Sequence, residues 1–351
     1  MPPTPSPASA PTATGAAPGP EALAALRSLL EEHGERPREL RASLLSGGRS
    51  NLTYTVTDGH RSWVLRRPPL GHVLATAHDM GREYRVMAAL ATTPVPVPRT
   101  VLLDEAGELL GAPCYIMDKV EGTVLRDGAD LDGVAPGDRA RLAEAFVDAL
   151  ADLHTVDPAA VGLADLGRPD GYLERQVRRW RTQLAASRSR ELHDLDRLAE
   201  RLAQSVPPSR GGAIVHGDFR LDNAILDHTD PARVLAVLDW EMATMGDPLA
   251  DLALFALYWE GWAGLDNPFA ATPTEHGFPT TPGLLERYAR RTGATLDDGG
   301  WYAGFAYFKF AAICEGIHYR HVSGLTVGEG FDRFGAMVPE LARRGVAALG
   351  R

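Results

Sequence analysis

The residues around Asp218 combine the side chains that phosphoryl transfer requires. The run from His216 to Asn223 reads His-Gly-Asp-Phe-Arg-Leu-Asp-Asn, and Asp239 follows after two short apolar segments. In such a transfer the protein orients a hydroxyl group, accepts its proton late, and neutralises the charge of the transferring group with metal ions. Asp218 can face the hydroxyl, while Asn223 and Asp239 offer the oxygen ligands that Mg²⁺ prefers. The spacing therefore predicts a magnesium-dependent transfer site.

One cation lies inside this run. Arg220 stands two residues after Asp218, where its guanidinium can reach the terminal phosphate as it transfers. We expect loss of that charge to reduce the reaction rate more than nucleotide binding. His216 is better explained as a residue that hydrogen-bonds the loop than as a general base, because Asp218 already serves as the base.

Hydrophobic periodicity predicts the elements that position these residues. Short apolar segments at 213–215, 224–226 and 234–238 are typical of strands, and they flank the polar run. From about residue 138 onward the rest of the chain shows helical patterns, at 138–156, 170–204, 249–261, 281–292 and 298–319.

The N-terminal part has a different character. An amphipathic helix over 21–33 precedes a predicted hairpin at 44–66, whose turn is Asp58-Gly59. A helix near 77–88 is ended by prolines, and strands follow near 100–104 and 114–120. A small strand-rich lobe followed by a mostly helical one is the expected organisation.

Composition excludes several classes of partner. The net charge of −10 and the lack of a Lys/Arg-rich block argue against a nucleic-acid partner. No window approaches the roughly 18 apolar residues of a membrane span, and the two cysteines have no metal-ligand spacing. Residues 1–20 are rich in Pro, Ala, Ser and Thr, which predicts a disordered tail. We therefore expect a soluble, cytoplasmic protein with no membrane partner.

The run from His216 to Asn223 resembles the H-G-D-x-x-x-x-N catalytic loop of the aminoglycoside phosphotransferase family, relatives of the protein kinases. The resemblance implies an α+β, protein-kinase-like two-lobed fold, with a small antiparallel N-lobe carrying one helix and a larger, mostly helical C-lobe. It implies ATP or GTP as co-substrate, bound between an N-lobe at 21–120 and a catalytic, substrate-binding C-lobe at 121–351.

Two further segments resemble nucleotide-binding parts of this family. Residues 47–51 look like its phosphate-covering loop, where small residues let backbone amides approach phosphate oxygens. Residues 115–122 are similar to its interlobe hinge, whose backbone groups read the base. The candidates that follow are Gly48, Ser50 and Asn51 for the phosphates, and Met117, Asp118 and Val120 for the base.

In the second strand of the predicted hairpin, side chains alternate between the two faces of the sheet. This alternation places Val64 and Arg66 on one face and Arg67 on the other. Arg66 stands where the kinases have a lysine, and Glu83 is the candidate helix carboxylate to pair with it. The alternative is that Arg66 is a surface cation whose stem packs on an edge strand, with Glu83 pairing on the surface. Asp251 lies in the predicted helix that follows Asp239, and we expect its carboxylate to hold the catalytic loop in place.

A finer resemblance concerns residues 64–69, 171–180 and 315–320, which look like the branch related to the kinase domain fused to certain acyl-CoA dehydrogenases. It implies a hydroxyacyl-CoA as the acceptor and a functional link to an acyl-CoA dehydrogenase. The arginines of the helix near Trp180 are either a site for an anionic substrate or a solvated face.

Two alternatives remain open. One is a kinase for an aminoglycoside or another amino sugar. The other is a non-catalytic nucleotide-binding module, which the arginine at position 66 suggests.

Overall fold

A computed structural model describes residues 17–45, 51–69, 79–267, 271–326 and 330–350. Gly48, Ser50 and most of the predicted tail lie outside the described residues. The chain divides into two compact units, 1–88 with 98–119, and 89–97 with 120–351. Residues 89–97, which the sequence analysis placed in the first lobe, cluster with the second unit.

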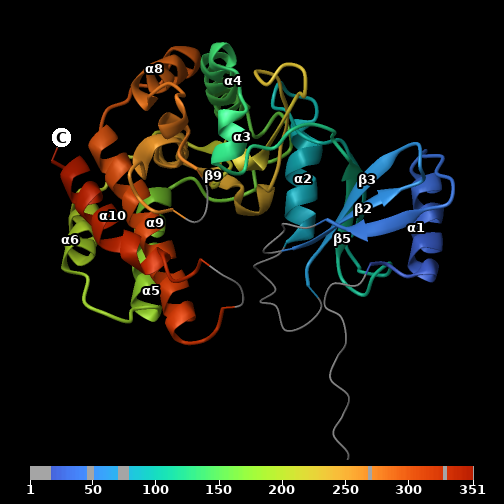
Figure 1. The fold of residues 1–351 in the computed structure, drawn as a ribbon, viewed down its shortest axis with the longest axis horizontal. Coiled ribbons are helices and arrows are strands. Elements are labelled where there is room, and N and C mark those ends of the chain that lie inside the picture. The colour runs from blue at the N-terminus through green and yellow to red at the C-terminus, as the bar shows by residue number, and fades with distance from the viewer. Residues whose placement is uncertain (1–16, 46–50, 70–78, 268–270, 327–329, 351) are drawn as a thin grey trace, which may run out of the picture. The chain divides into compact units, whose positions relative to one another are not determined.

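The first unit is built on a five-stranded antiparallel sheet, in the order β1-β2-β3-β5-β4 (Figure 1). The predicted hairpin is confirmed, because β2 and β3 pair across a turn in which Gly59 has a φ of 86°. The strands are β1 (Arg41–Leu44), β2 (Leu52–Thr57), β3 (Ser62–Arg67), β4 (Thr100–Asp104) and β5 (Cys114–Asp118).

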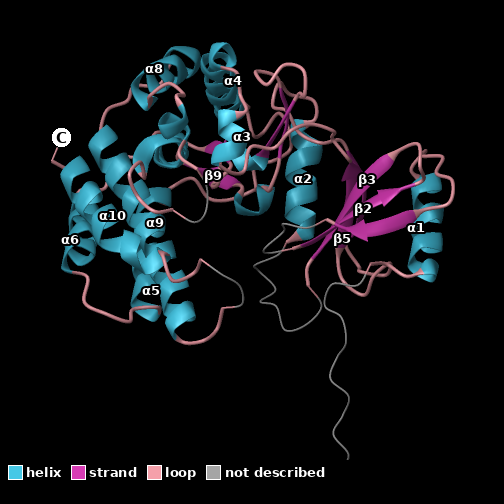
Figure 2. Cartoon of the chain, in the orientation of Figure 1, coloured by secondary structure: helices cyan, strands magenta, loops and turns pink. Residues whose placement is uncertain are grey.

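The two faces of this sheet have different roles. Helix α1 (Pro20–Glu32) packs Leu26 and Leu30 on a core formed by one face, where Tyr54, Trp63 and Ile116 are fully buried. Figure 2 shows α1 lying along the sheet. Side chains alternate along a strand, so Val64, Arg66 and Met117 belong to the opposite face. Helix α2 (Met80–Leu90) contributes Glu83 to that face.

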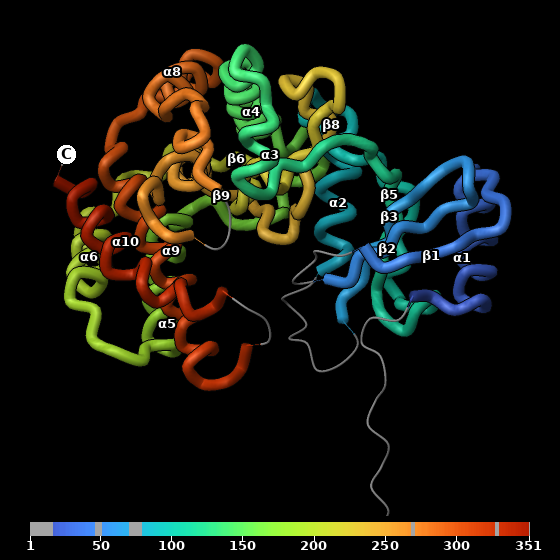
Figure 3. The backbone as a smooth tube through the Cα atoms, viewed as in Figure 1, coloured from blue at the N-terminus to red at the C-terminus, as the bar shows by residue number. Residues whose placement is uncertain are grey.

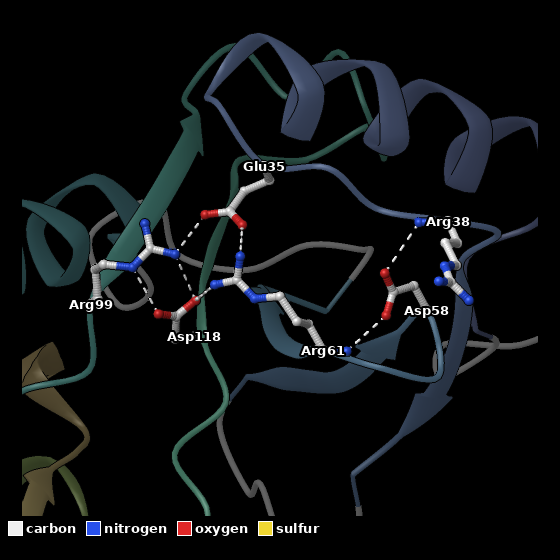
Figure 4. A network of polar contacts seen from close by, with 6 residues as sticks. All are labelled: Glu35, Arg38, Asp58, Arg61, Arg99 and Asp118. Atoms are coloured by element: carbon white, nitrogen blue, oxygen red, sulfur yellow. Dashed lines mark hydrogen bonds and ion pairs between the residues drawn. The ribbon is translucent and has the colours of Figure 1, made fainter.

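An ion network joins the end of α1 to the sheet (Figure 4). Glu35, only 6% exposed, contacts both Arg61 and Arg99. Arg99 also binds the Asp118 carboxylate at the end of β5, with an Nε–Oδ2 distance of 2.7 Å. The side chain of Asp118 therefore lies on the side of the sheet that α1 covers.

The second unit is mostly helical, with two short two-stranded sheets. Strands β6 (Ala213–Val215) and β9 (Thr244–Gly246) pair, as do β7 (Ala224–Leu226) and β8 (Val234–Val237). Labels mark the places of β6, β8 and β9 along the chain in Figure 3. Helix α9 (Gly299–Val322) is apolar over most of its surface and packs against α10, α5 and α7. Besides α9, the helices are α3 (Gly128–Asp132), α4 (Pro136–Thr155), α5 (Tyr172–Ala186), α6 (His193–Gln204), α7 (Pro248–Ala256), α8 (Thr281–Thr292) and α10 (Phe334–Ala348).

Two parts of the predicted helical pattern differ from the structure. The pattern over 170–204 is two helices, because the polar break after α5 is held by Arg190, which binds the buried Glu315 at 2.9 Å. The pattern over 249–261 changes from α-helix to a π-helical turn, η3 (Leu257–Gly261). Helix α10 was not predicted. Among the residues that the structure describes, no helix is long and apolar enough to cross a membrane.

Candidate functional site

The catalytic-loop candidate follows β6 directly. Gly217 has a φ of 83°, and a Cβ there would lie 2.9 Å from the Met242 side chain, so glycine is needed for the turn. The turn presents Asp218, and a 3-10 turn, η1 (Leu221–Asn223), brings the chain back. The local sequence therefore builds a tight loop between β6 and β7.

Within this loop Asp218 and Asn223 are in direct contact. The Asn223 amide nitrogen donates to the Asp218 backbone carbonyl at 2.9 Å and to its Oδ2 at 3.1 Å. Because both of these acceptors are oxygens of Asp218, the amide must point its nitrogen at them and its own oxygen away. As predicted, Asp218 and Asn223 lie at the two ends of one loop.

Asp239 lies after β8 and begins a 3-10 turn, η2 (Trp240–Met242). Its φ of 67° is in the left-handed region, which costs free energy for a residue other than glycine. Strained positions of this kind cluster at functional sites.

The donor set suits Mg²⁺. This ion takes one or two protein oxygens and completes its shell with water and substrate phosphates. Asn223 offers its outward amide oxygen and Asp239 a carboxylate, whereas the part of the chain described here holds no cluster of three or more His, Cys, Asp or Glu side chains that would bind a metal unaided. The residues therefore fit a metal that arrives with a nucleotide.

A buried carboxylate braces the loop, as the sequence analysis expected. Asp251 of α7 is 4% exposed and accepts hydrogen bonds from the backbone N–H groups of His216 (2.7 Å) and Gly217 (2.9 Å). His154 adds a third contact at 3.2 Å. Burial opposes ionisation, but these partners hold the pKa of Asp251 below its usual value.

His216 is a structural residue of the loop. Its Nδ1 lies 3.2 Å from the Asp218 N–H, and its Nε2 lies 2.9 Å from the Leu238 carbonyl. Nδ1 therefore accepts and Nε2 carries the proton, so neither ring nitrogen is available as a general base. The histidine connects the Asp218 loop to the residue preceding Asp239.

The structure adds Tyr258, which sequence reasoning missed. Its hydroxyl donates to Asp218 Oδ1 at 2.6 Å, and the residue belongs to the π-helical turn η3. Such turns occur frequently at functional sites. Tyr258 stands in an apolar helical run, so its local sequence carries no signal of this contact.

Arg220 lies beside Tyr258. Its guanidinium is paired with the Asp222 carboxylate and lies 5.6 Å from the centre of the Tyr258 ring. Burial disfavours the charge, but Asp222 and Asp218 nevertheless raise the pKa of Arg220 above its ordinary value. Its role toward a phosphate remains a prediction.

Lys309 of α9 is a second group that the sequence analysis did not single out. Its ammonium donates to the Gly217 carbonyl at 3.1 Å and lies 5.6 Å from the centre of the Trp180 ring. Burial lowers the pKa of Lys309. Of the 36 basic Lys and Arg residues in the chain, only Lys119 and Lys309 are lysines, a composition that could have drawn attention to this position.

In the first unit the nucleotide-facing candidates form a buried cluster around Glu83. The Arg66 guanidinium binds Glu83 Oε2 at 2.7 Å, and the Tyr115 hydroxyl donates to the same oxygen at 2.9 Å. Asn51 donates to Oε1 at 3.3 Å. Because Glu83 has no exposed surface, the alternative in which it pairs on the surface is wrong.

The other first-unit candidates lie around this cluster. Val64 and Met117 are opposite each other on β3 and β5, on the face that carries Arg66, and both are less than 9% exposed. Arg67 points to the other face, where it donates to the Tyr54 hydroxyl at 3.1 Å. The Asp118 N–H donates to the Arg99 carbonyl at 2.8 Å.

Val120 is the first residue of the second unit's main segment. Its part in binding a base, like that of Asp118, stays a prediction.

Comparison with known proteins identifies the family. The profile described as "Phosphotransferase enzyme family" matches residues 41–305, so the chain belongs to that family. A crystal structure of a Ralstonia eutropha protein classed as an aminoglycoside phosphotransferase has a TM-score of 0.82 and 33% identity, covering 93% of this chain and 98% of that one. The predicted protein-kinase-like fold is thereby confirmed.

Two curated relatives carry a different name. "Acyl-CoA dehydrogenase family member 11" of Gallus gallus is 37% identical over 310 residues, 86% of this chain and 39% of that protein. The protein of the same name from Pongo abelii is 34% identical over 331 residues, 92% of this chain and 42% of its own length. The chain spans about two fifths of the length of these relatives.

Proposed function

We propose that this protein transfers the terminal phosphoryl group of ATP or GTP to a hydroxyl group of a small molecule. The observation that carries the proposal is the contact of Asn223 with Asp218, which holds the catalytic carboxylate and turns the amide oxygen outward. Membership of the phosphotransferase family supports the same reaction class.

The chemistry follows from the side chains in the loop. Asp218 accepts a hydrogen bond from the acceptor hydroxyl, whose oxygen attacks the terminal phosphorus while the bond to the bridging oxygen breaks. The proton passes to Asp218, and the nucleoside diphosphate leaves. When bound by Asn223 and Asp239, Mg²⁺ would neutralise charge on the phosphate oxygens.

In the first unit, Arg66 is the cation proposed to hold nucleotide phosphates. Its guanidinium contacts Glu83 at 2.7 Å and the Tyr115 hydroxyl at 3.5 Å, and the whole side chain is 13% exposed. A guanidinium presents a planar array of donors whose geometry matches phosphate oxygens. Arginine at this position is therefore compatible with nucleotide binding.

For the acceptor we propose a hydroxyacyl-CoA, and with it a functional link to an acyl-CoA dehydrogenase. The named relatives at 34% and 37% identity support this choice. A cavity of about 20 Å³ beside the proposed catalytic loop supports it as well, because most of its lining is apolar, with Phe146, Phe219, Phe255, Trp259 and Trp262 alongside the charged Arg126, Arg220 and Asp222. Such walls suit an acyl chain better than the ammonium groups of an aminoglycoside. The cavity is about the size of one water molecule, so chain entry requires its side chains to move.

The test is magnesium-dependent phosphate transfer, followed by mass spectrometry, against a panel of hydroxyacyl-CoAs and aminoglycosides. Asp218→Asn is the control, because it preserves the shape of the loop. A phosphorylated acyl-CoA made only by the wild type is the expected result. A phosphorylated aminoglycoside would replace the proposed acceptor, and nucleotide binding without any transfer would favour a non-catalytic module.

A further inference from the structure

Asp218 presents two carboxylate oxygens, and each already has a partner. Oδ2 accepts from Asn223, the residue that also offers an oxygen to the metal. Oδ1 accepts from Tyr258 at 2.6 Å, the usual length of an O–H···O⁻ hydrogen bond. A carboxylate oxygen can accept more than one hydrogen bond, so an acceptor hydroxyl can reach Asp218 beside Asn223 on Oδ2 or in place of Tyr258 on Oδ1. The Tyr258 hydroxyl therefore occupies one of the positions that an acceptor hydroxyl can take on Asp218.

Tyr258 binds Asp218 through a neutral hydroxyl, the same kind of group that the acceptor would present. Burial and the adjacent Asp218 raise the pKa of Tyr258 well above its ordinary value, so the phenol keeps its proton and only donates. Its ring is 5.3 Å from the Trp262 ring and 5.6 Å from the Arg220 guanidinium, between centres. The hydroxyl is thus held against the carboxylate by packing on both sides.

The same residue lines the aromatic cavity beside the loop. That cavity is too small for an acyl chain as it stands, so movement of Tyr258 would both free Oδ1 and enlarge the cavity. One side chain thereby couples entry of an apolar acceptor to exposure of the catalytic carboxylate.

We propose that the Tyr258 hydroxyl occupies the acceptor position on Asp218 and keeps water away from this carboxylate until the acceptor displaces it. This inference rests on the proposed transfer reaction. The reaction it suppresses is hydrolysis of the bound nucleotide. In that reaction a water oxygen bonds to the terminal phosphorus, the bond to the bridging oxygen breaks, and the water proton passes to Asp218 and then to solvent.

Tyr258→Phe tests this role, because phenylalanine keeps the ring between Arg220 and Trp262 and removes only the hydroxyl. Release of phosphate from ATP and from GTP is measured with Mg²⁺ and without any acceptor. We expect the variant to hydrolyse nucleotide about tenfold faster than wild type, the factor that corresponds to one hydrogen bond to a charged group. The acceptor KM should fall in the same variant.

Two controls make the result specific. Tyr302→Phe removes another buried tyrosine hydroxyl that donates to a carboxylate, Asp247 at 3.1 Å, and should hydrolyse nucleotide like wild type. Adding Asp218→Asn to Tyr258→Phe should abolish the gain. Tyr258→Leu serves as a second variant if the first does not fold.

The outcomes separate this inference from the proposed function. If wild type transfers phosphate to an acceptor but Tyr258→Phe hydrolyses nucleotide no faster, the guarding role is wrong and the function stands. If Tyr302→Phe shows the same gain, the effect is structural and the guarding role is again wrong. If neither wild type nor variant binds nucleotide, both proposals fall.

Discussion

Two carboxylates, one in each unit, are held in different ways. In the first unit Glu83 is fully buried and forms an ion pair with Arg66, with Tyr115 and Asn51 as further donors. In the second unit Asp218 is held by an amide and a phenol, and it forms no ion pair with any residue in the described segments.

Under the proposed reaction, this difference separates a carboxylate that positions another group, Glu83, from one that reacts, Asp218. A cation bonded directly to a carboxylate opposes its protonation, and it also occupies the oxygens. Neutral donors orient the group and can be displaced by another hydroxyl. The catalytic loop therefore keeps its two nearby cations in other contacts, Arg220 on Asp222 and Lys309 on the Gly217 carbonyl.

The largest expected effect is that of Asp218→Asn on turnover. Loss of the general base should lower kcat by about 10²–10⁴-fold. Because its partners are neutral, asparagine can replace it with little change in stability. Steady-state kinetics and thermal unfolding of the same variant check both parts, and a variant that turns over like wild type would contradict the assignment of Asp218.

Glu83→Gln should show the opposite pattern. It leaves Arg66 as a buried cation without its counter-charge, which should destabilise the protein by about 3 kcal/mol and raise the nucleotide KM. Urea unfolding and nucleotide titration measure these effects. Glu31→Gln, on the exposed face of α1, is the matched control and should change neither quantity. A Glu83→Gln variant of unchanged stability would remove the distinction between the two carboxylates.

Lys309→Met tests whether a cation that contacts the loop backbone, and not the Asp218 carboxylate, contributes to the reaction. Removing the ammonium that binds the Gly217 carbonyl should lower kcat about tenfold, since a hydrogen bond from a charged donor is lost. Lys309→Arg should not restore the rate, because the planar guanidinium is bulkier than an ammonium at a partly buried position. Arg290→Met on the exposed surface of α8 serves as control, and full activity in Lys309→Met would show that the lysine only packs.

The smallest effect concerns pH and the β2–β3 turn. The backbone N–H groups of Arg61 and His60 lower the pKa of Asp58 from 3.8 to about 2. A lowered folded-state pKa stabilises the fold above the unfolded value of 3.8, and this contribution is lost as the pH falls toward about 2.

Comparison with Asp58→Asn isolates this contribution, because asparagine keeps an acceptor for the turn but does not titrate. Wild type should lose about 1 kcal/mol relative to the variant between about pH 4 and pH 2, a modest value because the carboxylate is partly exposed. Urea unfolding across this range measures the difference. Parallel pH dependence of the two proteins would show that Asp58 does not contribute.

Much of the fold could be predicted from the sequence, because its signals are local. Alternation in β2 and β3 and the Asp58-Gly59 turn predicted a hairpin that the register confirms. The pattern over 170–204 was too coarse, since the break between α5 and α6 depends on Arg190 reaching Glu315, a residue 125 positions away. Periodicity carries no information about such a contact.

The sequence by itself determined the contact at the heart of the proposed catalytic loop, because Asp218 and Asn223 are five residues apart and a short loop between two strands brings them together. It also determined which face of β3 carries Arg66. Only the tertiary structure decided what surrounds Asp218. Tyr258 lies 40 residues away along the chain and the Lys309 contact with Gly217 spans 92, and their positions follow from how α7, η3 and α9 pack. Spacing governs contacts within a loop, whereas contacts between distant elements depend on the packing of the whole unit.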